Sequence, residues 1–239
     1  MNANGVEKAT LLQVGGQFDN RYLIECVRRF PTRFRAVVLV DHEQPDAPET
    51  LARWAGEGAV GLRVFGPTAR SPGSDPLALW RKAADLRLPV SVFGSAEEFS
   101  SPAFEEVLSE LPSLPVIIEH LGRVGRAESP RTAFRRILDL ARYPNAYIKL
   151  HGLGEICPRP MPFPEPMRFP DIPPFMEMAY ETFGANRMMW GSDFPPVSGR
   201  EGYRNALRWT MEHIPFRNEA DKEWIFGKTA LSLFRFAGD

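Results

Sequence analysis

The chain has 239 residues, of which 44% are hydrophobic, so it is long enough to bury one sizeable core. Its formal net charge is −1 and it carries no basic stripe, which argues against nucleic acid and anionic membrane surfaces as partners. Two cysteines, Cys26 and Cys157, are typical of a reducing compartment rather than a disulfide framework. With no apolar run of transmembrane length and no signal-peptide core, we expect a cytoplasmic protein.

Seven short apolar runs predict strands. Several are rich in valine and isoleucine and nearly continuous rather than alternating, which is typical of strands in a buried parallel sheet. Successive runs begin roughly 24 to 41 residues apart, a spacing that suits repeated βα units. The predicted strands are Ala9–Val14, Arg35–Val40, Ala59–Phe65, Pro89–Phe93, Pro115–Glu119, Ala146–Leu150 and Arg187–Trp190.

The segments between these runs carry helix signals. Asp75, Ser101 and Ser129 each precede a proline, which places an N-cap acceptor before a residue that needs no N–H at the first helical position. Apolar residues recur at helical spacing between Asn20 and Phe30. Two further helical stretches, Tyr203–His213 and Asn218–Phe236, follow the last strand.

This order of strand then helix favours a parallel α/β sheet, either open and doubly wound or closed as a barrel. Residues 1–239 contain no repeat, linker or low-complexity tail, so we predict a single domain. One connection, Cys157–Pro174, has eight prolines and no helical period. It is interpreted either as a functional loop over the carboxyl end of the sheet or as a rigid surface loop.

In parallel α/β folds the site lies beyond the carboxyl ends of the strands. Asp193 follows an almost wholly apolar strand there, where a carboxylate could bind a divalent cation or act as a general base toward water. The alternative is a turn carboxylate that holds loop amides. His120, also at a strand end, is a candidate proton shuttle, oxyanion donor or metal ligand, or else a core histidine bonded to backbone.

Strand alternation predicts that His120 shares a face with Val116 and Ile118. Arg63 lies inside an apolar strand and needs an anionic partner, which is either a substrate carboxylate or an internal salt bridge. His151 and His42 are weaker candidates. Lys149 is interpreted either as an inward-facing strand lysine or, preferably, as one that extends toward the barrel rim.

Three other chemistries are disfavoured. The chain has no Gly-x-Ser-x-Gly elbow and no Gly-x-x-x-x-Gly-Lys phosphate loop. Its two cysteines lack the Cys-x-x-Cys spacing of structural zinc sites.

The chain resembles the amidohydrolase-related family that includes pyrone-dicarboxylate lactonase, sugar lactonases and carboxymuconate-semialdehyde-type decarboxylases. The His-Leu-Gly and Trp-Gly-Ser-Asp motifs, in this order, are the most specific part of the likeness. Five stretches carry it: Gly61–Arg63, Ile117–Gly122, Tyr147–Gly152, Met189–Pro195 and Ile225–Phe234. The resemblance implies a TIM-type (β/α)₈ barrel that hydrolyses a small organic substrate.

Two departures from the family pattern bear on the chemistry. The family opens with a strand carrying His-x-His, and its fifth strand often ends in a metal-binding histidine; neither is found here. Of the usual metal set only Asp193 remains, so we predict no cofactor for the chain as given, with zinc possible in a longer form. The fifth-strand departure is shared with metal-independent lactonases of the family.

The first hypothesis is therefore a lactonase-like hydrolase of a small, anionic lactone or related ester. Asp193 would act as the base toward water and His120 would polarise or protonate the reacting oxygens. Arg63, with Arg123, would hold a substrate carboxylate, and His151 is a further substrate-binding candidate. The alternatives are a metal-dependent decarboxylase and a truncated, non-catalytic barrel.

The count of seven strands also predicts that the first βα unit of the barrel is absent from this chain. The strands at Ala9–Val14 and Arg187–Trp190 would then face a gap with unpaired backbone groups. Such edges favour association, so a homo-oligomer is a possible assembly.

Overall fold

A computed structural model describes residues 1–157, 169 and 171–236 of the chain. The framework is one parallel sheet whose seven strands lie in chain order. All seven predicted strands are confirmed, with ends that move by at most two residues. They are β1 (Ala9–Leu12), β2 (Phe34–Leu39), β3 (Ala59–Phe65), β4 (Val90–Phe93), β5 (Val116–Ile118), β6 (Ala146–Leu150) and β7 (Met188–Trp190).

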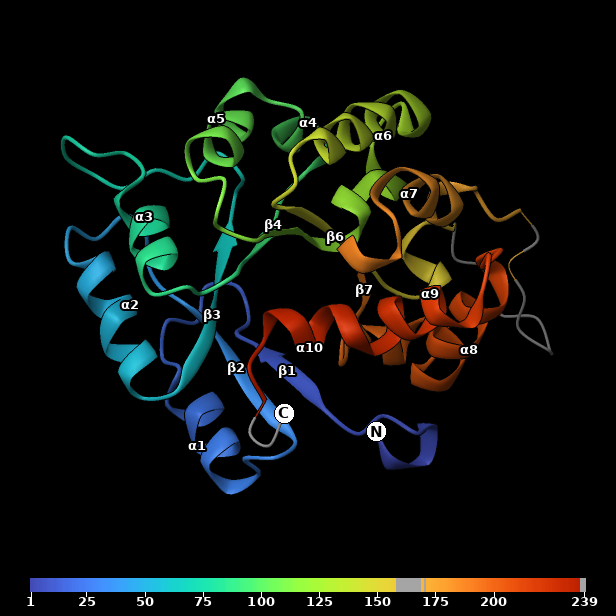
Figure 1. Ribbon diagram of the computed structural model, residues 1–239, viewed down its shortest axis with the longest axis horizontal. Helices are drawn as coiled ribbons and strands as arrows, with labels where there is room; N and C mark the ends of the chain where they lie inside the picture. The colour runs from blue at the N-terminus through green and yellow to red at the C-terminus, as the bar shows by residue number, and fades with distance from the viewer. Residues whose placement is uncertain (158–168, 170, 237–239) are drawn as a thin grey trace.

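Helices follow the strands and surround the curled sheet (Figure 1). This is the α/β architecture of a TIM-type barrel, and among the described residues no ladder joins β1 to β7. No helix in the described ranges is long and apolar enough to cross a membrane. The helices are α1 (Arg21–Arg29), α2 (Ala47–Gly56), α3 (Ala78–Asp85), α4 (Ala96–Phe99), α5 (Pro102–Glu110), α6 (Pro130–Asp139), α7 (Phe175–Phe183), α8 (Tyr203–His213), α9 (Glu219–Glu223) and α10 (Thr229–Leu233).

The three predicted helix starts have different outcomes. Ser101 caps α5 by accepting the N–H of Phe104 at 3.3 Å, as predicted. Ser129 precedes α6, but its side chain makes no capping bond. At Asp75 the prediction is wrong: α3 begins at Ala78, because Asp75 and Pro76 form a turn in which the carboxylate accepts the N–H of Leu77.

The C-terminal helical stretch is also less regular than predicted. Residues 218–236 divide into α9, a π-helical turn over Trp224–Lys228, and α10. Most of the proline-rich Cys157–Pro174 connection lies outside the described residues.

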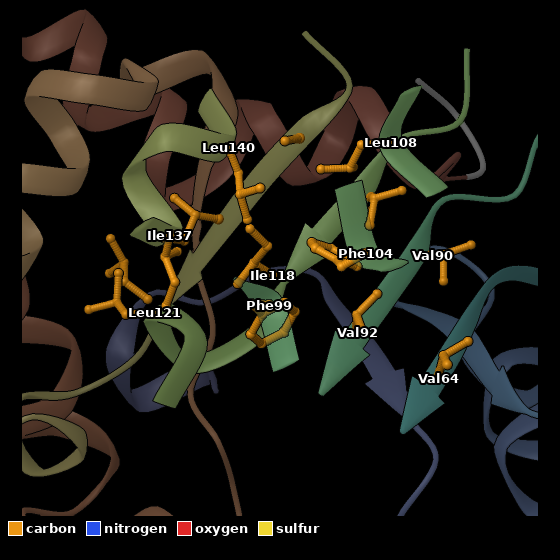
Figure 2. Close-up of a cluster of buried hydrophobic side chains, with 14 of the residues drawn as sticks. Val64, Val90, Val92, Phe99, Phe104, Leu108, Ile118, Leu121, Ile137 and Leu140 are labelled. Carbon is orange, nitrogen blue, oxygen red and sulfur yellow. The ribbon is translucent and has the colours of Figure 1, made fainter. Parts of the chain in front are cut away.

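The outer face of the sheet packs against the helices in one large apolar layer. Alternate residues of β3, β4 and β5 point into it, and Figure 2 shows them meeting side chains from α4, α5 and α6. Burying each such side chain contributes roughly 1.5–3 kcal/mol to folding. The layer includes Val64, Val90, Val92, Phe99, Phe104, Leu108, Ile118, Leu121, Ile137 and Leu140.

The inner face of the sheet is divided along the strand direction. Toward the amino ends it carries the inner apolar cluster, which consists of Val37, Ile117, Met189, Phe234 and Phe236. Toward the carboxyl ends it carries the inner charged cluster, which consists of Arg63, Ser91, Glu119 and Lys149. Because side chains alternate along a strand, Ile117 and Glu119 point to the same side and lie one step apart.

Candidate active site

The inner charged cluster is built around the carboxylate of Glu119, which is only 1% exposed. Arg63 forms a two-pronged ion pair with it, with Nη2 to Oε2 at 2.6 Å and Nε to Oε1 at 3.1 Å. Ser91 donates to Oε1 at 2.6 Å, and Lys149 Nζ lies 3.5 Å from the same oxygen. Burial raises the pKa of Glu119, but the charges of Lys149 and Arg63 outweigh it and hold this pKa well below its usual range.

Two expectations about this cluster are resolved by its geometry. For Arg63 the internal salt bridge is observed; its remaining Nη1 donates to the backbone oxygen of Gln13 at 2.7 Å. For Lys149 the preferred interpretation was wrong, because the side chain does not extend to the rim, and the inward-facing alternative is observed. It is 6% exposed and donates to Ser91 Oγ at 2.9 Å, which keeps the ammonium paired inside the sheet.

Glu119 was not predicted as part of the site. It was assigned to the end of an apolar strand, where a carboxylate on the inner face would need cationic partners. Arg63 on β3 and Lys149 on β6 supply them. The alternation of Ile117 and Glu119 was the signal that could have identified it.

His120 lies in a left-handed turn that follows β5. Its φ and ψ are 55° and 38°, and Leu121, Gly122 and Arg123 also have φ between 50° and 65°. For residues with a Cβ this conformation costs roughly 1–2 kcal/mol each. The predicted shared face with Val116 and Ile118 is therefore wrong, because the chain leaves the strand conformation before His120. Val116 and Ile118 face the helices, whereas His120 faces the charged cluster.

Three carboxylates surround the His120 imidazole. Glu155 Oε2 lies 3.3 Å from Nδ1, while Glu119 Oε2 and Asp193 Oδ1 lie 3.8 and 4.0 Å from Nε2. Burial lowers the pKa of His120 to about 4, although Glu119 and Asp193 act in the opposite direction. At neutral pH the ring is therefore uncharged.

Asp193 follows β7 and has a φ of 51°. Burial raises its pKa above the ordinary value, and the nearby His120 partly offsets this. Its Oδ2 accepts a hydrogen bond from Arg200 Nη1 at 2.9 Å, and the same nitrogen pairs with Glu155 Oε1. Only the Oδ1 oxygen of Asp193 faces His120.

The two remaining predicted residues, His151 and Arg123, lie near His120. His151 stacks on it with ring centroids 4.0 Å apart, and its Nδ1 lies 2.7 Å from the backbone oxygen of Gly191. Arg123 lies over the ring of Phe93, which contacts His120 edge-on at 5.5 Å. The structure thus brings His120, His151 and Asp193 together, with Arg63 linked through Glu119 and Arg123 one ring away.

A cavity of about 270 Å³ opens at the carboxyl ends of β1, β2 and β3, and the rings of Phe65 and Phe93 connect its wall to His120. Its wall residue Phe65 packs against Phe93 with centroids 5.0 Å apart, and Phe93 in turn contacts His120. The cavity is lined by Gly16, Phe18, Leu39, Val40, Asp41, His42, Glu43, Val64 and Phe65. The weak candidate His42 therefore lies in this wall rather than beside Asp193.

Three residues offer donor atoms of the kind that bind zinc. His120, Glu155 and Asp193 each supply one atom, all within 4.8 Å of one another, and Nδ1 of His120 is buried without a hydrogen-bond partner. Glu155, on the 3₁₀ turn Leu153–Glu155, was missed, so the chain offers more ligands than predicted. These residues do not fit a divalent metal ion as they stand. Arg200 already donates to both carboxylates, so its positive charge compensates the negative charge that a metal would need.

Comparisons with known proteins agree with this architecture. Residues 3–236 match the Amidohydrolase family. The chain is 28% identical to an L-fucono-1,5-lactonase of Burkholderia ambifaria, over 97% of this chain and 81% of that protein. It is 27% identical to a 4-sulfomuconolactone hydrolase of Hydrogenophaga intermedia, over 80% of this chain and 59% of that protein.

A solved structure gives the same fold. An amidohydrolase from Burkholderia multivorans with bound zinc superimposes with a TM-score of 0.75 at 19% identity, covering 99% of this chain and 86% of that one. The family match spans nearly the whole chain, including both the His120 turn and the Asp193 strand end. The chain belongs to the amidohydrolase family.

Proposed function

We propose that this protein hydrolyses the ester bond of a small lactone. Family membership and the two curated relatives named as lactone hydrolases support this reaction class. The observation that carries the proposal is the pair formed by Asp193 Oδ1 and His120 Nε2, 4.0 Å apart at the carboxyl end of the sheet. A water molecule can contact both atoms at ordinary hydrogen-bond distances.

Asp193 acts as the general base in this proposal. Its raised pKa makes the carboxylate a stronger proton acceptor than an exposed aspartate. Asp193 takes a proton from water as the water oxygen bonds to the lactone carbonyl carbon. When the ring C–O bond breaks, the same proton passes to the ring oxygen, and the product is a hydroxy acid.

His120 polarises the reacting oxygens by hydrogen bonding rather than by giving up a full proton, because its pKa of about 4 keeps it neutral. His151 stacks behind it and fixes the plane of its ring, so we propose a positioning role for His151. No step needs a metal ion.

The residue proposed to bind the substrate carboxylate differs from the one expected from sequence. Arg63 is neutralised by Glu119, whereas Arg123 lies over the ring of Phe93 and forms no ion pair in the described part of the chain. We therefore propose Arg123 as the main contact for a substrate carboxylate, with Arg63 and Lys149 adding one net positive charge to the floor of the site. The cavity beside Phe65 would take the rest of the molecule.

The test is a panel of aldonolactones and muconolactones, with acid release followed by a pH indicator. Asp193→Asn should lower kcat/KM by roughly 10³-fold or more on the best substrate. Asp139→Asn, which changes an exposed carboxylate, should leave it unchanged. Full activity in Asp193→Asn would refute the proposed base.

The same preparation separates the alternatives. Release of CO₂ from an aromatic carboxylate, dependent on added metal, would replace lactone hydrolysis by the decarboxylase hypothesis. Binding of lactones with no turnover of any of them would favour a non-catalytic barrel.

The cellular setting and assembly also remain proposals. Cys26 and Cys157 are both free, which supports the cytoplasm as the location. Association of two copies at the open edges of the sheet is the assembly that we propose, because β1 and β7 each pair on one side only in the described structure.

A further inference from the structure

Arg200 occupies a position in the site that the proposed reaction does not explain. It follows the 3₁₀ turn Pro196–Gly199, and only 17% of its side chain is exposed. Its Nη1 donates to Asp193 Oδ2 and pairs with Glu155 Oε1. Its Nε lies 3.6 Å from Glu201 Oε2. The Arg200 guanidinium thus forms ion pairs with three carboxylates.

Glu201 holds the Arg200 side chain in position. It is 4% exposed, and its Oε1 accepts the N–H of Gly154 at 3.2 Å. Gly152 also packs tightly against this carboxylate, since a Cβ on Gly152 would fall 1.8 Å from the same oxygen. Glu201 therefore ties the loop after β7, which carries Arg200, to the turn that carries Glu155. The guanidinium is held in place by packing as well as by charge.

The same two carboxylates are part of the donor set that could bind a metal ion. Glu155 Oε2 and Asp193 Oδ1 face the ring of His120, whose Nδ1 is buried and has no hydrogen-bond partner. Glu155 Oε1 and Asp193 Oδ2 face Arg200. A divalent ion among the three donors would therefore lie directly across the two carboxylates from a fixed positive charge.

From this geometry we propose that Arg200 is the resident cation of the site and keeps it from binding divalent metal. The guanidinium supplies the positive charge that the paired carboxylates require, and its repulsion of a second cation weakens zinc binding by about 100-fold or more. It also leaves Asp193 Oδ1 available to water. This inference concerns the charge balance of the site and does not depend on which lactone is hydrolysed.

The experiment is a zinc titration of chelator-treated full-length protein by calorimetry, with bound metal counted by elemental analysis after dialysis. Wild type should retain no stoichiometric zinc. Arg200→Met should bind one zinc per chain at least about 100-fold more tightly. The double variant Arg200→Met with Glu155→Gln should lose that gain, because one donor is removed. Arg204→Met, which removes an exposed arginine four residues along the chain, should behave as wild type.

Two results would overturn the proposal. One is stoichiometric zinc in the wild type with a Kd below about 1 μM. The other is an Arg200→Met protein, folded by circular dichroism, that binds zinc no more tightly than wild type. Arg200→Gln serves as the second variant if the methionine variant does not fold, and the same two outcomes decide it. Because the readout is binding, its failure is distinct from a failure to find a lactone substrate.

Discussion

The inner apolar cluster and the inner charged cluster of the sheet differ in chemistry although β5 and the residue directly after it contribute to both. Ile117 and Glu119 lie two residues apart and point the same way, yet one joins the inner apolar cluster and the other the inner charged cluster. The apolar end gains stability from burial, whereas the charged end needs ion pairs to compensate for desolvation. This contrast separates apolar residues that stabilise the sheet from charged residues that surround the candidate site, and it can be tested from either end.

The largest effect is expected at the charged end. Glu119→Gln leaves Arg63 and Lys149 buried without their anion, which should lower the free energy of unfolding by about 3–5 kcal/mol. It should also lower activity, because the charge beside His120 changes. Urea unfolding followed by tryptophan fluorescence measures the first effect. Glu106→Gln, in an exposed pair with Arg70, should change stability by less than about 1 kcal/mol.

At the apolar end stability and activity should separate. Phe234→Ala removes a side chain that is 2% exposed and packs near Gly61, and should lower the free energy of unfolding by about 3 kcal/mol or more. The kcat of the folded protein should not change. Leu231→Ala, on the exposed face of α10, is the matched control. A kcat that falls with Phe234→Ala would show that the two ends are not independent.

Acidification should weaken the charged end, where His120 is buried and uncharged. The pKa of His120 is about 4 in the folded protein and near 6.5 when unfolded, so the unfolded chain binds an extra proton between these values. His120 alone should therefore lower stability by roughly 2 kcal/mol as the pH drops from 7 to 5, and His151, whose pKa burial also lowers, should add to this loss. The depressed pKa of Glu119 adds a loss at lower pH. In His120→Asn the slope between pH 7 and pH 5 should flatten; an unchanged slope would contradict this assignment.

The smallest effect is expected from a buried hydrogen bond that holds the backbone of His151. Thr210 Oγ1 is buried within 3.0 Å of the His151 backbone oxygen and 2.7 Å of the Ala206 oxygen. Thr210→Val should cost about 1 kcal/mol in thermal or urea unfolding, because a buried acceptor loses its donor. Thr182→Val removes a similar bond on an exposed helix face and should be nearly neutral.

The sheet was predictable from sequence because its strands are short, continuous apolar runs at regular intervals. The outer layer follows from the same signal, since the residues that pack under the helices are the apolar ones. The site was only partly predictable. Asp193 and His120 stand at strand ends, where chemistry is expected in this architecture, and their side chains lie 4.0 Å apart.

Other residues of the candidate site have no local sequence pattern that would have identified them. Glu155 and Arg200 are 45 residues apart and lie in short irregular turns without periodicity, so their pairing depends on the tertiary fold. The position of His120 was mispredicted because alternation assumes that the strand conformation continues, and here the backbone turns left-handed. Lys149 was misplaced because Glu119 had not been recognised as its partner.

The left-handed turn after β5 also limits which sequences this protein can tolerate. Leu121 is 1% exposed and has a φ of 50°, so the position needs an apolar side chain that is not β-branched; leucine and methionine satisfy both conditions. Gly122 has a φ of 65°, and a Cβ there would meet Ile137 Cδ1 at 2.3 Å. Libraries that randomise this loop should therefore recover very few substitutions at 121 and 122, even under selection for folding alone. Much of the information in the His-Leu-Gly motif is conformational, and only its first residue, His120, faces the candidate active site.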